Sequence, residues 1–389
     1  MRGQFDDQLP LFHVFCVEDR IRPDHPLRDI KRRVDRLLDS MSPQFAKAYS
    51  RTGRPSVPPE RLLKALLLMA LYSVRSERQL CERLNTDLLF RWFLDLQPSE
   101  DAFDATTFTH NRQRLDDHTL TKSFFDAVVR EALTAGLCSE HFSVDGTLIE
   151  SWASAKSFQP KAMASPLDGS SDSGVSPSDA NGFQPRNVEV DFHGQKRTND
   201  THQSRTDPEA RLYRKGRGKE AKLAHLGHTL GENRHGLIVA ITVTEATGTA
   251  EREAALEMLD ELQTRHAVRP TTLGADKGFD SGEFFRELES RRIEPHVPLV
   301  KEPRDPAEVP YQKQRPGVEA RQRMKTRMLS EGYRLSQKCR KKIEEGYGWL
   351  KEIAGLGRSR VVGRWKLKQL LEIGAAAYNL VRLRKLKPA

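Results

Sequence analysis

The chain has 389 residues, enough for two or three domains that each bury a core. Hydrophobic residues make up 37% and charged residues 30%, which excludes a membrane-embedded protein. The acidic N-terminal residues do not fit a secretory signal, so we expect a cytoplasmic location. Lys and Arg outnumber Asp and Glu by ten, and the segment from Lys301 onward holds 23 basic and 9 acidic residues. This concentration of positive charge favours a polyanionic partner, and we expect that partner to be nucleic acid rather than a membrane.

Residues 1–140 are expected to form an all-α domain. Residues 58–74 begin with two prolines and then space their leucines as a buried helix does. Ser76 and Gln79 form an S-x-x-Q capping box, which predicts a second short helix after a break of about two residues. This order is compatible with a tight helix-turn-helix.

A third helix is predicted to begin at Thr106 or Thr107, and it carries Arg112 and Arg114. Three close helices with basic residues on the last one suit binding in a DNA groove. The spacing fits an ordinary helical packing or dimerisation domain equally well, so both interpretations stay open. A long amphipathic helix follows and ends near Gly136.

From residue 141 to residue 389 the pattern is that of an α/β domain. The segment HFSVDGTLI alternates apolar and polar residues, which predicts a half-buried strand. A disordered insertion is expected at about 155–205, because 15 of the 18 residues from Ser165 to Gly182 are Ser, Gly, Pro, Asp or Asn. Two strands, a helix, a strand, a helix and a short strand follow. A basic loop at about 301–330 and two helices, at 335–353 and 367–386, complete the chain.

Two aspartates lie at the ends of predicted strands, each close to a glycine: Asp145 in SVDGT and Asp276 in GADKG. Phosphodiester chemistry with two metal ions requires hard oxygen ligands that converge from separate elements. Surface turns are also rich in Asp, so the spacing alone favours a turn-forming role for each residue.

A third acid, Glu344, lies in the predicted helix 335–353. At roughly 100° per residue, Arg340, Lys351 and Gln337 fall in one narrow wedge around it. The cations would keep the carboxylate ionised and bind phosphates. A solvated helix with incidental i,i+4 ion pairs gives the same pattern.

Three further polar segments are ambiguous. Asp280 is expected to cap the helix that follows it rather than to bind a metal. Asp207 precedes a proline, so turn initiation is its simplest role. The basic run that contains Arg214 and Lys215 fits a contact with a DNA backbone and a solvated loop equally well.

Nine short motifs follow one another along nearly the whole chain. Each is a weak signal by itself, but together and in this order they are specific. They are GRPSVPPERLL, LYSVRSERQL, FRWF, HFSVDGTLIESWAS, TDPEARLYRKG, GHTLGENRHGL, ADKGFD, RKKIEEGYGWLK and AAAYNLVRLRKL. In these motifs the chain resembles bacterial insertion-sequence transposases of family five, which have a DDE catalytic domain. The resemblance implies a ribonuclease-H-like α/β domain, with a mixed central sheet and flanking helices, preceded by the all-α domain.

The resemblance also implies a function and a site. Asp145, Asp276 and Glu344 match the catalytic Asp, Asp, Glu triad, which would hold two Mg²⁺ ions, with Mn²⁺ as a substitute. The activity implied is binding of terminal inverted repeats, cleavage at the element ends and transfer of the 3′-hydroxyl strands to target DNA. The implied partners are double-stranded DNA and a second copy of the chain on that DNA, in the nucleoid.

The family motif Y-x2-R-x3-E-x6-K matches at Arg340, Glu344 and Lys351, and it departs at Gln337, where the family has Tyr. Two other functions are considered: a metal-dependent nuclease of the same fold without strand transfer, and a noncatalytic DNA-binding protein derived from a transposase. The presence of all three acids weighs against the latter.

Overall fold

The structure, a computed structural model, describes residues 16–50, 52–53, 56–161, 198–214, 220–308 and 315–386. The chain divides into two compact units, one formed by Met1–Ala135 with Ile373–Ala389 and the other by Gly136–Glu372. The residues from Ile373 onward therefore belong to the first unit, whereas the sequence pattern assigns 141–389 to one domain. This part of the last helix is apolar, and Ala376, Leu380 and Leu383 are fully buried.

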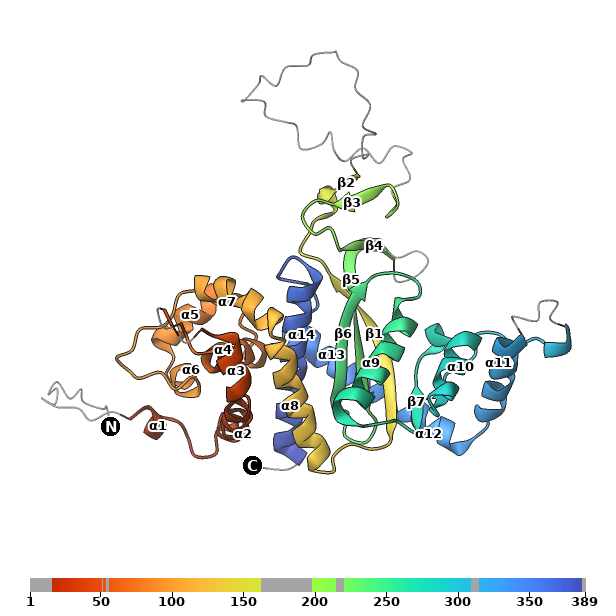
Figure 1. The fold of residues 1–389 in the computed structure, drawn as a ribbon, viewed down its shortest axis with the longest axis horizontal. Coiled ribbons are helices and arrows are strands. Elements are labelled where there is room, and N and C mark those ends of the chain that lie inside the picture. Colours follow the sequence, from red (N-terminus) through yellow and green to blue (C-terminus); the bar gives the residue numbers. More distant parts are fainter. Residues whose placement is uncertain are drawn as a thin grey trace, which may run out of the picture. The chain divides into compact units, whose positions relative to one another are not determined.

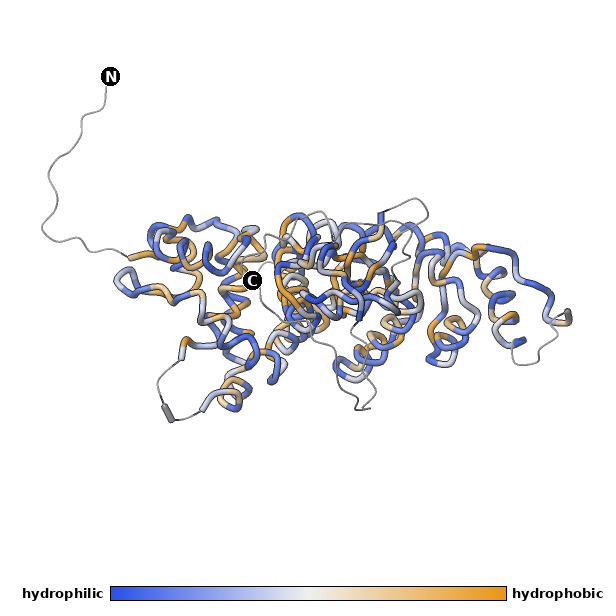
Figure 2. Tube along the Cα trace, turned by 90° about the horizontal axis from the view of Figure 1, so that it is seen from above, coloured by the Kyte–Doolittle hydropathy of each residue, from blue (hydrophilic) through white to orange (hydrophobic). Residues whose placement is uncertain are grey.

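The first unit is helical throughout its described residues, apart from its connecting loops (Figure 1). Its helices carry alternating hydrophobic and hydrophilic stretches, as expected where one face of each helix is buried (Figure 2). They are α1 (Val17–Arg20), α2 (Pro26–Ser40), α3 (Ser42–Ala48), α4 (Pro59–Leu71), α5 (Glu77–Thr86), α6 (Leu88–Phe93), α7 (Thr106–Asp117) and α8 (Leu120–Thr134).

The helix ends test the capping predictions. The capping box is confirmed, because the Ser76 side chain accepts a hydrogen bond from the backbone N–H of Gln79 at 3.1 Å. Helix α4 ends at Leu71, the last leucine of the segment 58–74, and Ser73 in the following loop has a positive φ of 53°. The prediction of a threonine cap on α7 is wrong, since the carboxylate of Asp104 accepts the N–H of Thr106.

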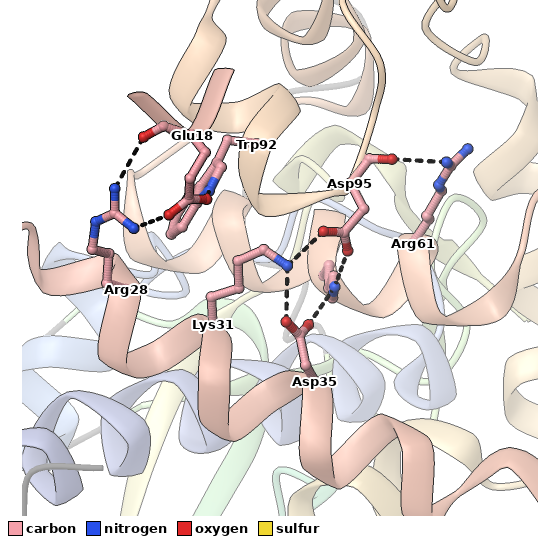
Figure 3. A network of polar contacts seen from close by, with 8 residues as sticks. Glu18, Arg28, Lys31, Asp35, Arg61, Trp92 and Asp95 are labelled. Carbon is pink, nitrogen blue, oxygen red and sulfur yellow. Dashed lines mark hydrogen bonds and ion pairs between the residues drawn. The ribbon is translucent and has the colours of Figure 1, made fainter. Parts of the chain in front are cut away.

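A network of ion pairs links several helices of this unit (Figure 3). The ammonium of Lys31 on α2 contacts Asp35 at 2.8 Å and Asp95 at 2.6 Å. Lys64 on α4, whose side chain is only 7% exposed, contacts the same two aspartates. The two lysines share both carboxylates, so each buried charge has a partner, as a buried ammonium requires.

The second unit is built on a mixed six-stranded sheet. Strand β5 pairs with β1 on one side and with β6 and the short strand β4 on the other, all antiparallel to it, and β7 and β8 extend the sheet beyond β1, in parallel with it. The strands are β1 (His141–Glu150), β4 (Arg211–Tyr213), β5 (Lys222–Glu232), β6 (Ile238–Glu245), β7 (Thr272–Gly274) and β8 (Glu294–His296).

Helices cover both faces of this sheet. Gly231 of β5 pairs with Ser143 of β1, and a side chain at Gly231 would contact Ile343 of α13. A side chain at Gly146 of β1 would instead contact Glu251 of α9. Because successive residues of a strand point to opposite faces, α13 and α9 lie on opposite sides. The helices of this unit are α9 (Ala250–His266), α10 (Gly282–Ser290), α11 (Arg315–Arg327), α12 (Glu331–Cys339), α13 (Lys341–Glu352) and the first residues of α14 (Arg364–Leu386), which continues into the first unit.

Three antiparallel strands followed by two parallel ones, with helices on both faces, make this a ribonuclease-H-like fold, as the resemblance implies. The parallel crossovers are α9, between β6 and β7, and α10, between β7 and β8. The carboxyl end of β7, Gly274, thereby pairs with Ser143 near the start of β1.

Two sequence expectations about loops change. Most of the expected insertion, residues 162–197, lies outside the described residues, but its described ends pair as the antiparallel strands β2 (Phe158–Pro160) and β3 (His202–Ser204). The expected basic loop at 301–330 contains a helix, α11, whose cations pair with acids. Arg323 and Arg327 both contact Glu289 on α10.

Candidate active site

Asp145 lies in the middle of β1, on the face that α13 covers. Its Oδ1 accepts a hydrogen bond from the backbone N–H of Gly146 at 2.9 Å. Burial raises the pKa of Asp145 to about 6, an effect that this hydrogen bond opposes. The negative charges of Asp276 and Glu344 raise the pKa further, and Arg340 lowers it. The first aspartate therefore experiences the field of both other predicted acids.

The strand register explains why Asp276 is close. His141, Phe142 and Ser143 pair in parallel with Thr272, Leu273 and Gly274. Continued by two residues, the same register sets Asp276 beside Asp145, and neighbouring strands are about 4.8 Å apart. The chain leaves β7 at this point, and Asp276 Oδ1 accepts the backbone N–H of Gly278 at 2.7 Å.

Glu344 comes to the same region on α13, which is fixed to the sheet by polar contacts. The Tyr347 hydroxyl, one turn after Glu344, donates to the backbone carbonyl of Asp145 at 2.5 Å, and it lies 3.3 Å from that of Gly227. The ammonium of Lys342 donates to the carbonyl of Asn233 at 3.0 Å. Glu344 itself is 58% exposed and lies 3.6 Å from the guanidinium of Arg340.

The donor set suits a divalent cation. Three carboxylates are hard oxygen ligands, and each aspartate uses Oδ1 in a backbone hydrogen bond while its Oδ2 makes no hydrogen bond within the described residues. As the side chains are placed, no three His, Cys, Asp or Glu residues among those described lie close enough to hold a metal ion. Glu344 is directed at Arg340, so a rotation of its exposed side chain would be part of metal binding.

Two transposase family models match the chain. The family described as "Transposase domain (DUF772)" covers residues 15–114, and the "Transposase DDE domain" family covers residues 189–380. The second match includes Asp276 and Glu344, and Asp145 precedes it. The chain belongs to the DDE transposases.

Solved structures of Mos1 transposase are similar to this DDE transposase. A paired-end complex with the left transposon end is 11% identical, with 79% of this chain and 82% of that chain covered and a TM-score of 0.21. The Mos1 strand transfer complex is 12% identical, with 80% and 82% covered and a TM-score of 0.20. No curated protein matches the chain. Among the described residues, no helix is long and apolar enough to cross a membrane.

The structure divides the predicted helix 335–353 of this DDE transposase. Helix α12 ends at Cys339 and α13 begins at Lys341, so one helical wheel does not apply to Gln337 and Glu344 together. The Gln337 amide donates to the backbone carbonyls of Ala275, at 3.3 Å, and His296, at 2.6 Å. Where the family motif has Tyr, this residue thus fixes α12 to the ends of β7 and β8, next to Asp276.

The predicted cations differ in their environment. Arg340 is 19% exposed, and its Nε is buried without a hydrogen-bond partner among the described residues, which suits an anion ligand. Lys351 is partly buried in the last turn of α13. Arg214 is exposed after β4, whereas Lys215 lies outside the described residues. Arg340 also lies 3.6 Å from Glu344, and its charge lowers the pKa of Asp145.

In the first unit, Arg112 does not fit the predicted role of a DNA contact. It is buried and ion-paired with Glu77 of α5, so it holds α7 against that helix. Arg114 is half-buried, stacks on the Tyr49 ring with 4.6 Å to the centroid, and donates to Asn111. The pairing of Arg112 with an acid on another helix is not visible in the sequence, which is why its basic side chain suggested a DNA contact.

Two acids outside the triad have structural partners. The carboxylate of Asp280 binds the Arg321 guanidinium at 2.9 and 2.7 Å and accepts the N–H of Val300, so the prediction of a helix cap is wrong. Asp207 is completely buried and accepts hydrogen bonds from Ser151, at 2.7 Å, and His225, at 3.0 Å. Its role thus goes beyond turn initiation.

Tyr347, whose hydroxyl fixes α13 against β1, was not predicted from the sequence. A tyrosine three residues after a candidate acid lies on the same side of a helix, and this spacing was the available signal. Tyr347 is buried, and burial raises its pKa well above the usual value, with the charge of Asp145 adding to the effect. The phenol therefore stays protonated and able to donate.

Proposed function

We propose that this DDE transposase cleaves DNA at the ends of an insertion sequence and joins the freed 3′-hydroxyl strands to target DNA. The observation that carries the proposal is that the strand register places Asp276 beside Asp145 and that the charges of Asp276 and Glu344, both remote in sequence, raise the pKa of Asp145. DDE transposase domains generally use divalent metal ions. We assign the three carboxylates as the residues that hold two Mg²⁺ ions.

When bound, such ions lower the pKa of an attacking water or hydroxyl and offset the charge of the leaving oxygen. The chain's own residues prepare the site. The backbone N–H groups of Gly146 and Gly278 orient Asp145 and Asp276. Arg340, with its unpartnered Nε, would bind a phosphate beside Glu344 in the bidentate manner of a guanidinium.

Further DNA contacts are proposed for Lys351, Arg114 and Arg214, and Arg112 is left out because Glu77 binds it. The resemblance to family five further supports terminal inverted repeats as the sites bound and a homodimer that bridges two ends. A protein with this activity would work on bacterial chromosomal DNA in the cytoplasm.

The experiment uses a DNA duplex with the inverted repeats that flank the coding sequence. Asp145→Asn, Asp276→Asn and Glu344→Gln should each reduce cleavage by about a hundredfold or more while end binding persists. Glu345→Gln, the matched control on the adjacent residue, should cleave normally. Cleavage that survives in any of the three variants would remove that acid from the site.

Precut ends distinguish transposition from simple nuclease activity. With a supercoiled target, the wild-type chain should join precut ends to it in the presence of Mg²⁺. Cleavage without joined products would favour the metal-dependent nuclease, and end binding without either reaction would favour a noncatalytic DNA-binding protein.

A further inference from the structure

Trp152 exposes its ring to solvent just after the strand that carries Asp145. Its side chain is 56% exposed, and no other Phe, Trp or Tyr among the described residues is exposed. Burial of an aromatic side chain removes roughly 150–250 Å² from water, so a ring left in solvent forgoes a large stabilisation within the fold. Such a ring is a candidate contact for another molecule.

The backbone on both sides of this ring is held in place. Ser151 and Ala153 are buried. The Ser151 N–H donates to the Leu223 carbonyl on β5 at 2.9 Å, and the Ala153 N–H donates to the Ser151 hydroxyl oxygen at 3.1 Å. That hydroxyl donates in turn to the buried carboxylate of Asp207 at 2.7 Å. The fold therefore presents the Trp152 ring on a fixed backbone, which lowers the entropic cost of a contact.

A guanidinium accompanies the ring. The Cζ of Arg358 lies 5.7 Å from the centroid of the Trp152 ring. The backbone of Arg358 is bridged to Glu150 at the end of β1, and the Ser359 N–H donates to the Glu150 carbonyl at 2.7 Å. The Glu150 carboxylate is bound by Lys222, and within the described residues the Arg358 side chain pairs with no acid. The ring and the cation are thus both available to a ligand.

The pair lies on the same two elements as the candidate acids. Strand β1 carries Asp145 and leads to Trp152, and α13 carries Glu344 and leads to Arg358. Helix α13 packs on β1 (Figure 1). Seven residues separate Asp145 from Trp152, which is at most about 24 Å of extended chain. At roughly 3.4 Å per base pair, a duplex along β1 covers this distance in about seven base pairs.

We propose that Trp152 and Arg358 form a DNA contact that holds the element end several base pairs away from the acids. The indole ring packs on a base or sugar, and the guanidinium binds a neighbouring phosphate. The inference rests on the proposed function, since it presupposes that DNA lies across the acids. Both residues position the DNA and do not touch the reacting atoms.

The first test is binding of the full chain to the inverted-repeat duplex, followed by fluorescence anisotropy with a chelator present. Trp152→Ala should weaken binding by about fivefold or more, the lower end of the effect of an aromatic ring on a nucleotide. Trp152→Phe keeps an aromatic ring and should weaken binding less. Binding by Trp152→Ala that equals that of the wild type would overturn the proposal.

Arg358→Gln separates the charge from the ring. It should lower the affinity and reduce the slope of log affinity against log salt by about one, the value of one phosphate contact. Trp152→Ala should leave this slope unchanged. Arg286→Gln is the matched control, because it removes the same charge from an exposed position on α10 of the same unit. It should change the affinity less than about twofold and the slope not at all.

Photo-cross-linking locates the contact on the DNA. Duplexes carrying 5-iodouracil at successive positions from the cut should cross-link to Trp152 about five to seven base pairs away from it. The cross-link should disappear in Trp152→Ala. Cross-links confined to other residues at all positions would overturn the proposal.

Asp145→Asn separates this inference from the function on which it rests, because it should bind the duplex and fail to cleave it. If it does so, and Trp152→Ala and Arg358→Gln bind like the wild type, the inference is overturned and the proposed function stands. If the wild-type chain neither binds nor cleaves the duplex, both are overturned. Trp152→Ala should unfold at the wild-type urea concentration, since the ring is exposed, which distinguishes a lost DNA contact from a lost fold.

Discussion

The Tyr347 hydroxyl donates a hydrogen bond of 2.5 Å to the backbone carbonyl of Asp145. This contact joins the helix that carries Glu344 to the strand that carries the first aspartate. It uses the backbone of Asp145 and leaves the carboxylate available. The distance between two residues of the triad is thus fixed by a third residue that bears no charge.

Replacement of Tyr347 by Phe should therefore impair cleavage more than DNA-end binding. The loss of one buried hydrogen bond should lower the free energy of unfolding by about 1 to 2 kcal/mol, measured by urea denaturation. Tyr333→Phe is the control, because the Tyr333 ring packs on His296 and its hydroxyl makes no hydrogen bond within the described residues. Equal cleavage by Tyr347→Phe and the wild type would contradict this role.

Gln337 is expected to position Asp276 through α12. Gln337→Glu replaces a donor by an acceptor that faces the carbonyls of Ala275 and His296, so it should destabilise the fold by about 1 to 3 kcal/mol and reduce cleavage. Gln337→Ala should have a smaller effect, and Lys338→Gln, at the exposed neighbouring position, should have none. Thermal unfolding and cleavage assays provide the comparison, and a Gln337→Glu variant as stable as the wild type would refute the expectation.

The pH dependence of stability should report on Asp145. In the folded protein the pKa of Asp145 is about 6, whereas in the unfolded chain this carboxyl has the usual, lower pKa of an aspartate. Between about pH 4 and pH 6 the folded state therefore holds a proton that the unfolded state has lost. The contribution of this group to the unfolding free energy therefore falls as pH rises through that window. Asp145→Asn abolishes the effect.

In the metal-free protein, the stability gained by Asp145→Asn should be near zero below about pH 4, grow up to pH 6 and then stay constant at up to about 3 kcal/mol. Urea denaturation from pH 4 to pH 8 with a chelator present measures the difference between variant and wild type. A difference that is flat, or that shrinks as pH rises, would be incompatible with a raised pKa.

Asp280 should behave differently from Asp276, four residues before it. Asp280→Asn disrupts the pair with Arg321 between the end of η3 (Lys277–Phe279) and α11, and should cost about 1 to 3 kcal/mol of stability. Its Mn²⁺ affinity should remain that of the wild type. Asp276→Asn should show the reverse, weak Mn²⁺ binding with little loss of stability, by calorimetry and urea denaturation.

Local patterns were sufficient to predict the strand around Asp145 and the capping box at Ser76. They could not predict the register that sets residue 276 beside residue 145, because strand pairing depends on the crossover α9 and on side chains remote in sequence. Helix α11 was missed because a proline lies near its start and only Ala320 and Met324 are buried, too few for a visible helical period.

The same limit applies to the charged residues. Arg112 and Arg114 are alike in sequence, yet the former is buried against Glu77 and the latter stacks on Tyr49. Which charge enters a site is decided by packing that the sequence does not show.

Anomalous diffraction from crystals of the full chain soaked in Mn²⁺ tests the central claim most directly. The account predicts a strong anomalous peak in contact with the carboxylates of Asp145 and Asp276, with Glu344 rotated away from Arg340 and toward the ion. Bound Mn²⁺ elsewhere, with the two aspartates unoccupied at saturating Mn²⁺, would contradict it.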